Sequence, residues 1–221
     1  MTPLQSLSPV RDDKLDATIA LLERATKKFG DLAYSCSLGV EGIVLTDIIW
    51  TRFPSIEIFT LDTGRLHEET YLLLERLQRR YGRTMRVVYP DARELERLVA
   101  RQGINGFYDS VENRHACCDV RKINPFRRAI DGRKAWITGV RREQSKLRAS
   151  GDEIVWDDQH GLWKVSPMLD WTEGEIWSYA RSYGLPYNAL HDRGYPSIGC
   201  APCTRAIQPG ESKRAGRWWW E

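Results

Sequence analysis

Apolar residues recur at helical spacing near the start of the chain. They stand at positions Leu15, Ile19, Leu22 and Phe29. An amphipathic helix buries one face through such a period, so we expect a helix over residues 13–29, ended by Gly30.

Short apolar runs and helical periods then alternate along the chain. The pattern predicts strands at 32–36, 56–61, 84–89 and 134–138, and helices at 41–50, 67–81 and 92–101. This alternation is typical of an α/β fold with a mainly parallel sheet and helices on both faces. Ligands of such sheets lie beyond the carboxyl ends of the strands, so the loops after Cys36, Leu61 and Thr138 are the expected site.

The pattern changes after residue 150. Two strands are expected within 153–165, joined at 157–161, and a helix over 172–183 capped by Thr172 with Glu175 three residues on. The loop-rich remainder is too short to bury a core alone. We therefore expect a single domain over 1–221, with a helical segment at 1–30, a core at 31–150 and a C-terminal lobe at 151–221.

Composition and charge narrow the function classes. Hydrophobic residues make up 42% and charged residues 29%, which is typical of a folded globular protein. The net charge of +3 does not indicate bulk attraction to nucleic acid or membrane. Neither a signal peptide nor an apolar run of ~20 residues is visible, so a cytoplasmic protein is expected.

The basic residues nevertheless gather in three groups. Two of the groups flank cysteine pairs, and this clustering indicates a compact polyanionic ligand. The groups are Arg114, Arg121, Lys122, Arg127 and Arg128; Arg141, Arg142, Lys146 and Arg148; and Arg193, Arg205, Lys213, Arg214 and Arg217.

Four of the five cysteines form two tight pairs, Cys117–Cys118 and Cys200–Cys203. A disulfide framework is disfavoured in a cytoplasmic chain. Structural zinc suits the second pair but not adjacent cysteines, and the second pair lacks the setting of a thioredoxin-like redox motif. A four-iron, four-sulfur cluster needs four thiolates on a wider frame. Spacing alone favours the cluster and leaves zinc and unligated thiols open.

Two loops could contact a nucleotide. Ser35, Ser37 and Gly39 stand where a strand leads into a helix, so backbone N–H groups and small hydroxyls can face an anion or a nucleotide edge. Leu61-Asp62-Thr63-Gly64 follows the next strand. Short loops of this composition also occur as plain turns.

Several motifs together resemble the adenosine phosphosulfate and phosphoadenosine phosphosulfate reductases. They are Cys117-Cys118-Asp119-Val120-Arg121-Lys122 with Pro125, residues 138–145, residues 190–195, residues 197–205, and Gly216-Arg217-Trp218-Trp219-Trp220. The paired cysteines resemble the branch that uses adenosine phosphosulfate (APS). The resemblance implies an adenine-nucleotide alpha-hydrolase-like fold and reduction of APS to sulfite and AMP in sulfate assimilation and cysteine biosynthesis. Thioredoxin is the implied reductant, and a homo-oligomer is possible.

The resemblance also implies roles for individual residues. Cys117, Cys118, Cys200 and Cys203 would hold a [4Fe-4S] cluster, and Leu61, Asp62, Thr63 and Gly64 would contact the nucleotide. Lys122, Arg142, Arg214 and Arg217 would face the phosphosulfate, where the leaving AMP develops negative charge. Arg121, Arg141 and Arg205 are expected to be structural or to support these residues.

The nucleophile implied by the resemblance is a cysteine in a C-terminal Glu-Cys-Gly-Leu-His segment, and the chain ends at Glu221 before any such segment. Cys36 lies in an expected core strand and is interpreted as a buried structural cysteine. We therefore expect no catalytic cysteine within the chain and a nucleophile C-terminal to Glu221. The 221-residue chain is expected to bind nucleotide and cluster without turnover.

Other functions stay open. The enzyme could act on the 3′-phosphorylated nucleotide (PAPS). A nucleotide-activating ligase or sulfurtransferase would show a fuller Ser-Gly-Gly-x-Asp-Ser loop than Ser37-Leu38-Gly39-Val40-Glu41-Gly42. A zinc-stabilised nucleotide- or nucleic-acid-binding protein is compatible with the basic groups and tryptophans, and metal content would separate it from the reductase.

Overall fold

A computed structural model of the chain describes residues 12–144 and 151–221. The chain forms two compact units. The first comprises Met1–Phe59 with Gly132–Tyr187, and the second comprises Thr60–Asp131 with Asn188–Glu221. Each unit is thus built from two segments that are distant in the sequence.

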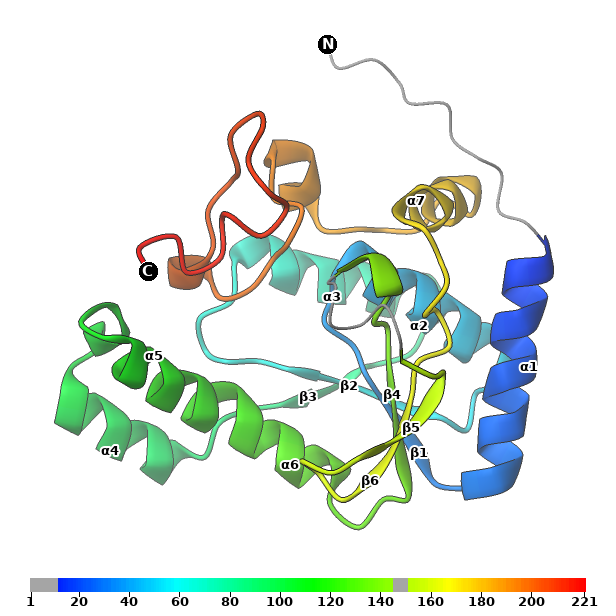
Figure 1. The fold of residues 1–221 in the computed structure, drawn as a ribbon, viewed down its shortest axis with the longest axis horizontal. Helices are drawn as coiled ribbons and strands as arrows, with labels where there is room; N and C mark the ends of the chain where they lie inside the picture. The colour runs from blue at the N-terminus through cyan, green and yellow to red at the C-terminus, as the bar shows by residue number, and fades with distance from the viewer. Residues whose placement is uncertain (1–11, 145–150) are drawn as a thin grey trace. The chain divides into compact units, whose positions relative to one another are not determined.

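The first unit holds most of the sheet (Figure 1). Its elements are α1 (Asp12–Phe29), β1 (Leu32–Ser35), α2 (Val40–Arg52), β2 (Glu57–Leu61, whose last two residues belong to the second unit), β4 (Ala135–Thr138), η3 (Arg142–Gln144), β5 (Ile154–Asp157), β6 (Leu162–Val165) and α7 (Glu173–Ser182).

The second unit holds a series of helices and short turns (Figure 1). Its elements are α3 (Glu68–Tyr81), β3 (Arg86–Val88), α4 (Ala92–Gln102), η1 (Gly106–Tyr108), α5 (Val111–Cys118), η2 (Asp119–Ile123), α6 (Asn124–Ile130), η5 (Ala189–Arg193) and η6 (Ala201–Cys203).

The sheet has six strands in the order β3-β2-β1-β4-β6-β5. β1 pairs in parallel with β2 and β4, β4 pairs in parallel with β6, and β5 alone is shown pairing antiparallel, with β6. The prediction of a mainly parallel α/β sheet is therefore confirmed. Because the chain continues from β1 to β2 on one side and returns to β4 on the other, the strand order reverses between β1 and β4, which is where such folds bind ligands.

The core of the first unit explains its continuous apolar runs. Ala33 and Tyr34 on β1 and Ile43 and Val44 on α2 are fully buried. A parallel strand covered on both faces needs apolar residues at successive positions. Trp171, 2% exposed, donates a 2.9 Å hydrogen bond from Nε1 to Thr18 Oγ1 and so joins the 166–171 segment to α1.

Most predicted elements are present within one to three residues of the expected bounds. The hairpin of β5 and β6 is confirmed, as is the capping box of α7, in which Thr172 and Glu175 hydrogen-bond reciprocally. Residues 111–130 had no predicted structure and form α5, η2 and α6. No helix in the described ranges is both long and apolar enough to cross a membrane.

Candidate functional site

The first cysteine pair ends a helix in the second unit. Ser110 begins α5 by accepting a 3.1 Å hydrogen bond from the backbone N–H of Asn113. Cys117 and Cys118 end the helix, and the chain continues directly into η2, a π-helical turn. Such wide turns inside α-helices are frequently found at functional sites. Within this turn Arg121 is buried and Lys122 is exposed.

The second pair stands on the short turn η6. The backbone N–H of Cys203 donates to the carbonyl of Cys200 at 3.0 Å, which closes the turn. Ala201 N–H donates to the carbonyl of Arg65 at 2.8 Å, and Tyr108 Oη donates to the carbonyl of Pro202 at 2.9 Å. These bonds fix the pair against two other segments of the second unit.

The structure brings the two pairs together. Cys117 and Cys203, each 9% exposed, are buried in one cluster with Leu98 and Phe107, and Cys200 packs against it. Burial first, and then the charges of Cys200, Cys118 and Cys117, raise the pKa of Cys203 to about 12. The four thiols are thus electrostatic neighbours.

The chemistry of this cluster fits an iron-sulfur group. It offers four soft thiol donors in partly apolar surroundings that include Trp218 and Trp220. Thr63 Oγ1 lies 3.2 Å from Cys200 Sγ, so a hydroxyl also contacts one sulfur. In residues 12–144 and 151–221, no group of three or more His, Cys, Asp or Glu side chains is placed to hold a metal ion.

Positive side chains surround the same thiols. Burial raises the pKa of both Cys117 and Cys118, while Arg121 lowers the pKa of Cys117, and Arg114 and Lys122 lower that of Cys118. Such charges would offset part of the negative charge of four thiolates. Lys122, one of the predicted phosphosulfate-facing residues, therefore shares the electrostatic environment of the thiols.

The predicted Leu61–Gly64 loop lies in this environment too. Asp62 Oδ1 accepts hydrogen bonds from Gly64 N–H at 2.7 Å and from Tyr71 Oη at 3.0 Å. An aspartate that bonds the backbone two residues on stabilises a turn. Arg121 Nη1 donates to the Thr63 carbonyl at 2.7 Å, so the π-helical turn holds this loop.

Arg217 and Arg214 stand beside Trp218 at the end of the chain. The guanidinium carbons of Arg217 and Arg214 lie 5.1 and 5.8 Å from the centroid of the Trp218 ring, within cation–π range. Trp218 itself has φ of 49°, an unusual backbone conformation for a bulky residue. Such outliers are found where the surrounding structure fixes the chain.

Lys122 belongs to this positive group. Its pKa lies below the usual value, first because protein surrounds the ammonium and then because of the like charges of Arg217 and Arg214. The residue as a whole nevertheless keeps an exposed surface. Lys122, Arg214 and Arg217 therefore form one cationic group in the second unit.

The other predicted nucleotide loop follows β1 in the first unit. Leu38 is buried with φ of 59°, so the loop from Ser37 to Gly39 carries a strained non-glycine residue. Leu38 N–H donates to Cys36 Sγ at 3.4 Å. Cys36 is 2% exposed, and burial raises the pKa of its thiol, which agrees with its interpretation as a structural cysteine.

Arg142 follows β4, also in the first unit. Its Nε donates to Asp170 Oδ1 and its Nη1 to the Gly151 carbonyl, both at 2.5 Å. Ser145, Lys146 and Arg148 of the predicted basic loop lie outside the described residues. The predicted residues are thus divided: Ser35, Ser37, Gly39 and Arg142 in the first unit, and the remainder in the second.

Sequence reasoning missed three supporting contacts. It assigned no role to Glu41, which pairs with Arg141, or to Arg65, whose guanidinium donates to the Ile104 carbonyl and lies over Phe107. It also missed the contact of Thr63 with a cysteine. The one signal available was a carboxylate, Glu41, in the first turn of a helix expected to face an anion.

The chain is similar to known proteins over most of its length. Residues 31–206 match the family described as the phosphoadenosine phosphosulfate reductase domain. A protein of Allochromatium vinosum named adenosine 5'-phosphosulfate reductase is 50% identical over 205 residues, covering 93% of this chain and 80% of the relative. A protein of Burkholderia cepacia with the same name is 45% identical, covering 98% of this chain and 86% of the relative.

Solved structures are similar as well. A phosphoadenylyl-sulfate (PAPS) reductase of Candida auris, in a phosphate complex, is 25% identical with a TM-score of 0.73 and covers 93% of this chain and 100% of its own. An FMN adenylyltransferase of Candida glabrata is 16% identical with a TM-score of 0.62 and covers 96% of this chain and 73% of its own. The second likeness concerns the fold alone.

Proposed function

Because this chain belongs to the phosphoadenosine phosphosulfate reductase domain family, we propose that it reduces APS to sulfite and AMP in sulfate assimilation. The observation that carries the proposal is the 50% identity to a protein named APS reductase over 93% of the chain. The family match over residues 31–206 spans the positions of both cysteine pairs.

We propose APS rather than PAPS as the substrate. The curated relatives named APS reductase are 42–50% identical, whereas the PAPS reductase of known structure is 25% identical. The two cysteine pairs support the same choice through the family resemblance. PAPS reduction is the alternative that nucleotide binding would test.

The proposed roles of individual residues rest on the family resemblance and on the physical chemistry of each group. The hydroxyls of Ser35 and Ser37 and the backbone at Gly39 would bind the nucleotide at the amino end of α2, where N–H groups favour an anion. The family resemblance supports Leu61, Asp62, Thr63 and Gly64 as further nucleotide contacts. Lys122, Arg214 and Arg217 would stabilise the negative charge that develops on the leaving phosphate, and Arg142 would add a further cation.

We also propose that Cys117, Cys118, Cys200 and Cys203 hold a [4Fe-4S] cluster. When bound, the cluster would supply a fixed charge distribution and a structural crosslink rather than the electrons of reduction. The cations around the thiols support this assignment, because they would offset the charge of the thiolates. Neither zinc nor a redox-active pair accounts as well for adjacent cysteines.

Thioredoxin as reductant, a cytoplasmic location and a possible homo-oligomer complete the proposal. They come from the family resemblance and from the composition of the sequence. The attacking thiol that the resemblance places C-terminal to Glu221 stays a prediction.

Nucleotide binding tests the proposal without requiring turnover. The purified chain is titrated calorimetrically with APS, AMP, PAPS and ATP under anaerobic conditions. We expect APS and AMP to bind one per chain and PAPS and ATP to bind at least about tenfold more weakly, a difference of about 1.4 kcal/mol. Equal or tighter binding of PAPS would favour the alternative substrate, and no binding of either sulfated nucleotide would contradict the function.

A further inference from the structure

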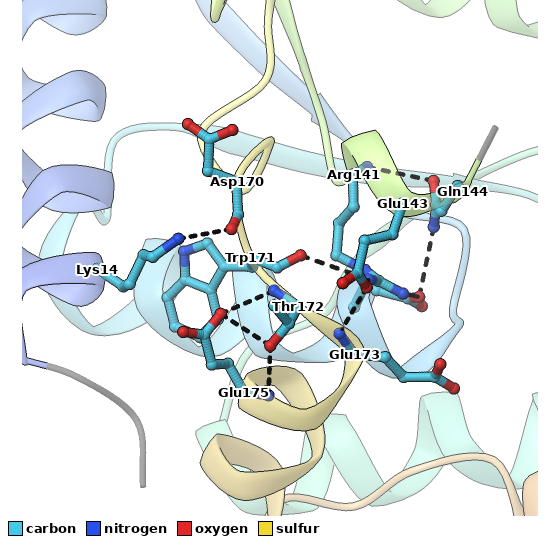
Figure 2. Close-up of polar contacts among 10 residues, drawn as sticks. Lys14, Arg141, Glu143, Gln144, Asp170, Trp171, Thr172, Glu173 and Glu175 are labelled. Carbon is cyan, nitrogen blue, oxygen red and sulfur yellow. Dashed lines mark hydrogen bonds and ion pairs between the residues drawn. The ribbon is translucent and has the colours of Figure 1, made fainter. Parts of the chain in front are cut away.

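A buried guanidinium joins the two loops that follow β1 and β4 in the first unit. Arg141 is 4% exposed. Its Nη2 pairs with Glu41 Oε1 at 2.9 Å and its Nη1 with Glu143 Oε2 at 2.8 Å. Figure 2 shows Arg141 among Glu143, Gln144 and Trp171. A planar guanidinium can make two such contacts at once, which an ammonium cannot.

The Glu41 carboxylate lies directly against the predicted nucleotide loop. A Cβ atom added to Gly39 would stand 3.3 Å from Glu41 Oε2 and 3.7 Å from Ser37 Oγ. The Glu41 carboxylate thus occupies the space beside Gly39, in the loop that we propose binds the nucleotide. A shift of this carboxylate would shift the loop.

Two further contacts tie the loops together. Gln144 Oε1 accepts from Arg141 N–H at 3.2 Å, and Gln144 Nε2 donates to Glu41 Oε1 at 3.3 Å. A Cβ added to Gly139 would lie 3.4 Å from Tyr34 Oη and 3.9 Å from the Glu41 carbonyl. The backbones after β1 and β4 therefore approach closely at the point where the strand order reverses.

The other side of Arg141 is anchored to a helix. Arg141 Nη1 reaches the Trp171 carbonyl at 3.4 Å, and Glu143 Oε2 accepts from the backbone N–H of Glu173 at 3.0 Å (Figure 2). Glu173 is the first residue of α7, whose start is also fixed by the Thr172–Glu175 capping box. The guanidinium is thereby anchored to the start of α7 on one side and contacts Glu41, after the β1 loop, on the other.

The ion pair between Arg141 and Glu41 also changes the charge that a bound nucleotide would meet. Glu41 stands in the first turn of α2, at the helix end that favours an anion. A free carboxylate there would repel a nucleotide phosphate, and the Arg141 guanidinium offsets its charge. Removing one partner of a buried ion pair also leaves the other uncompensated.

We propose that Arg141 is a positioning residue for the nucleotide, acting through Glu41 on the Ser37–Gly39 loop. The inference rests on the proposed function, because it takes this loop to be the nucleotide's binding loop. Arg141 does not contact the nucleotide itself in this account.

The test measures AMP affinity of the wild type, Arg141→Gln and Arg141→Lys by calorimetry, with thermal unfolding recorded for each. We expect Arg141→Gln to raise the Kd for AMP about tenfold, which corresponds to about 1.4 kcal/mol. Arg141→Lys keeps the positive charge but loses the planar group that contacts two carboxylates at once, so we expect a smaller rise in the Kd for AMP, about threefold. If Arg141→Gln does not fold, the lysine variant alone decides.

Arg133 offers a matched control in the same unit. It pairs with Asp31 at 2.5 Å and with Glu57, at the amino ends of the strands and so at the opposite edge of the sheet. Arg133→Gln should lower the unfolding temperature and leave the AMP Kd unchanged. Unchanged AMP affinity in the folded Arg141 variants, or an equal loss in Arg133→Gln, would overturn the inference. A wild type that binds no AMP would instead overturn the proposed function.

Discussion

At the scale of single residues, the side chain of Arg217 depends on a glycine. A Cβ added to Gly199 would lie 2.4 Å from Arg217 Nη2 and 2.5 Å from its Cζ, closer than atoms can approach. Arg217 Nη1 donates to the Ile198 carbonyl and Ser197 Oγ, both at 3.3 Å, so the guanidinium lies along this backbone. Only a residue without a side chain leaves it room.

We predict that Gly199→Ala displaces the Arg217 guanidinium and weakens APS binding about tenfold, a loss of about 1.4 kcal/mol. Calorimetric titration with APS checks it. Gly174→Ala is the control, because its added Cβ would meet nothing closer than 3.9 Å and its φ needs no glycine. Unchanged APS affinity in a folded Gly199→Ala protein would show that Arg217 does not bind the phosphosulfate from this position.

Asp157 gives a pH-dependent contribution to stability. Its burial alone would raise its pKa, but hydrogen bonds from His160 and Trp136, together with the His160 charge, lower the pKa overall. Trp136 Nε1 donates to Asp157 Oδ2 at 3.1 Å, and His160 Nδ1 lies 2.9 Å from the same oxygen. These contacts join the turn after β5 to β4.

A lowered folded-state pKa contributes stability above the unfolded pKa and loses it as pH falls through the folded pKa. Asp157→Asn should therefore reduce the free energy of unfolding by about 1 kcal/mol at pH 7. The difference from wild type should shrink below about pH 4, where the unfolded carboxylate titrates. Urea unfolding at several pH values measures it, and a difference that does not change with pH would contradict the assignment.

The sequence suggested which residues belong to the candidate site, but not which neighbouring side chains hold them in place. The cysteine pairs stood out because their spacing is unusual, and Lys122 because it belongs to a motif of the family resemblance. The partnership of Glu41 with Arg141 spans 100 positions, and no local pattern connects them. An ion pair between distant positions depends on the order of the strands, which periodicity does not specify.

At the scale of elements, α7 shows how a short motif determines a helix start. Thr172 Oγ1 accepts from Glu175 N–H at 3.2 Å, and Glu175 Oε2 accepts from Thr172 N–H at 2.7 Å. The sequence alone predicted this box. Thr172→Ala should reduce the free energy of unfolding by about 1 kcal/mol, and Thr172→Ser should retain most of the stability. Equal losses in the two variants would rule out the hydroxyl as the cause.

The helices that carry the first cysteine pair were not predicted. Val111–Cys118 is mostly polar or cysteine and shows no apolar period, and Cys117 is its buried residue. The Ser110 cap and packing of α5 against η1 and η2 stabilise it instead. A helix whose buried residue is a cysteine is not detected from a period of apolar residues.

At the scale of the whole molecule, the α/β class and the parallel sheet followed from alternating periods. The grouping into two compact units did not, because each unit joins segments that are far apart in the sequence. The sequence suggested boundaries along the chain, whereas packing joins the 188–221 segment to residues 60–131. This packing is what gathers the two cysteine pairs.

Metal analysis tests most directly whether the chain is the cluster-containing, APS-using reductase that we propose. The protein is purified anaerobically, its iron, sulfide and zinc are measured, and its optical spectrum is recorded beside that of Cys203→Ser. We expect about four irons and four sulfides per wild-type chain with absorbance near ~400 nm, and loss of both in the variant. One zinc and no iron in the wild type would contradict the account.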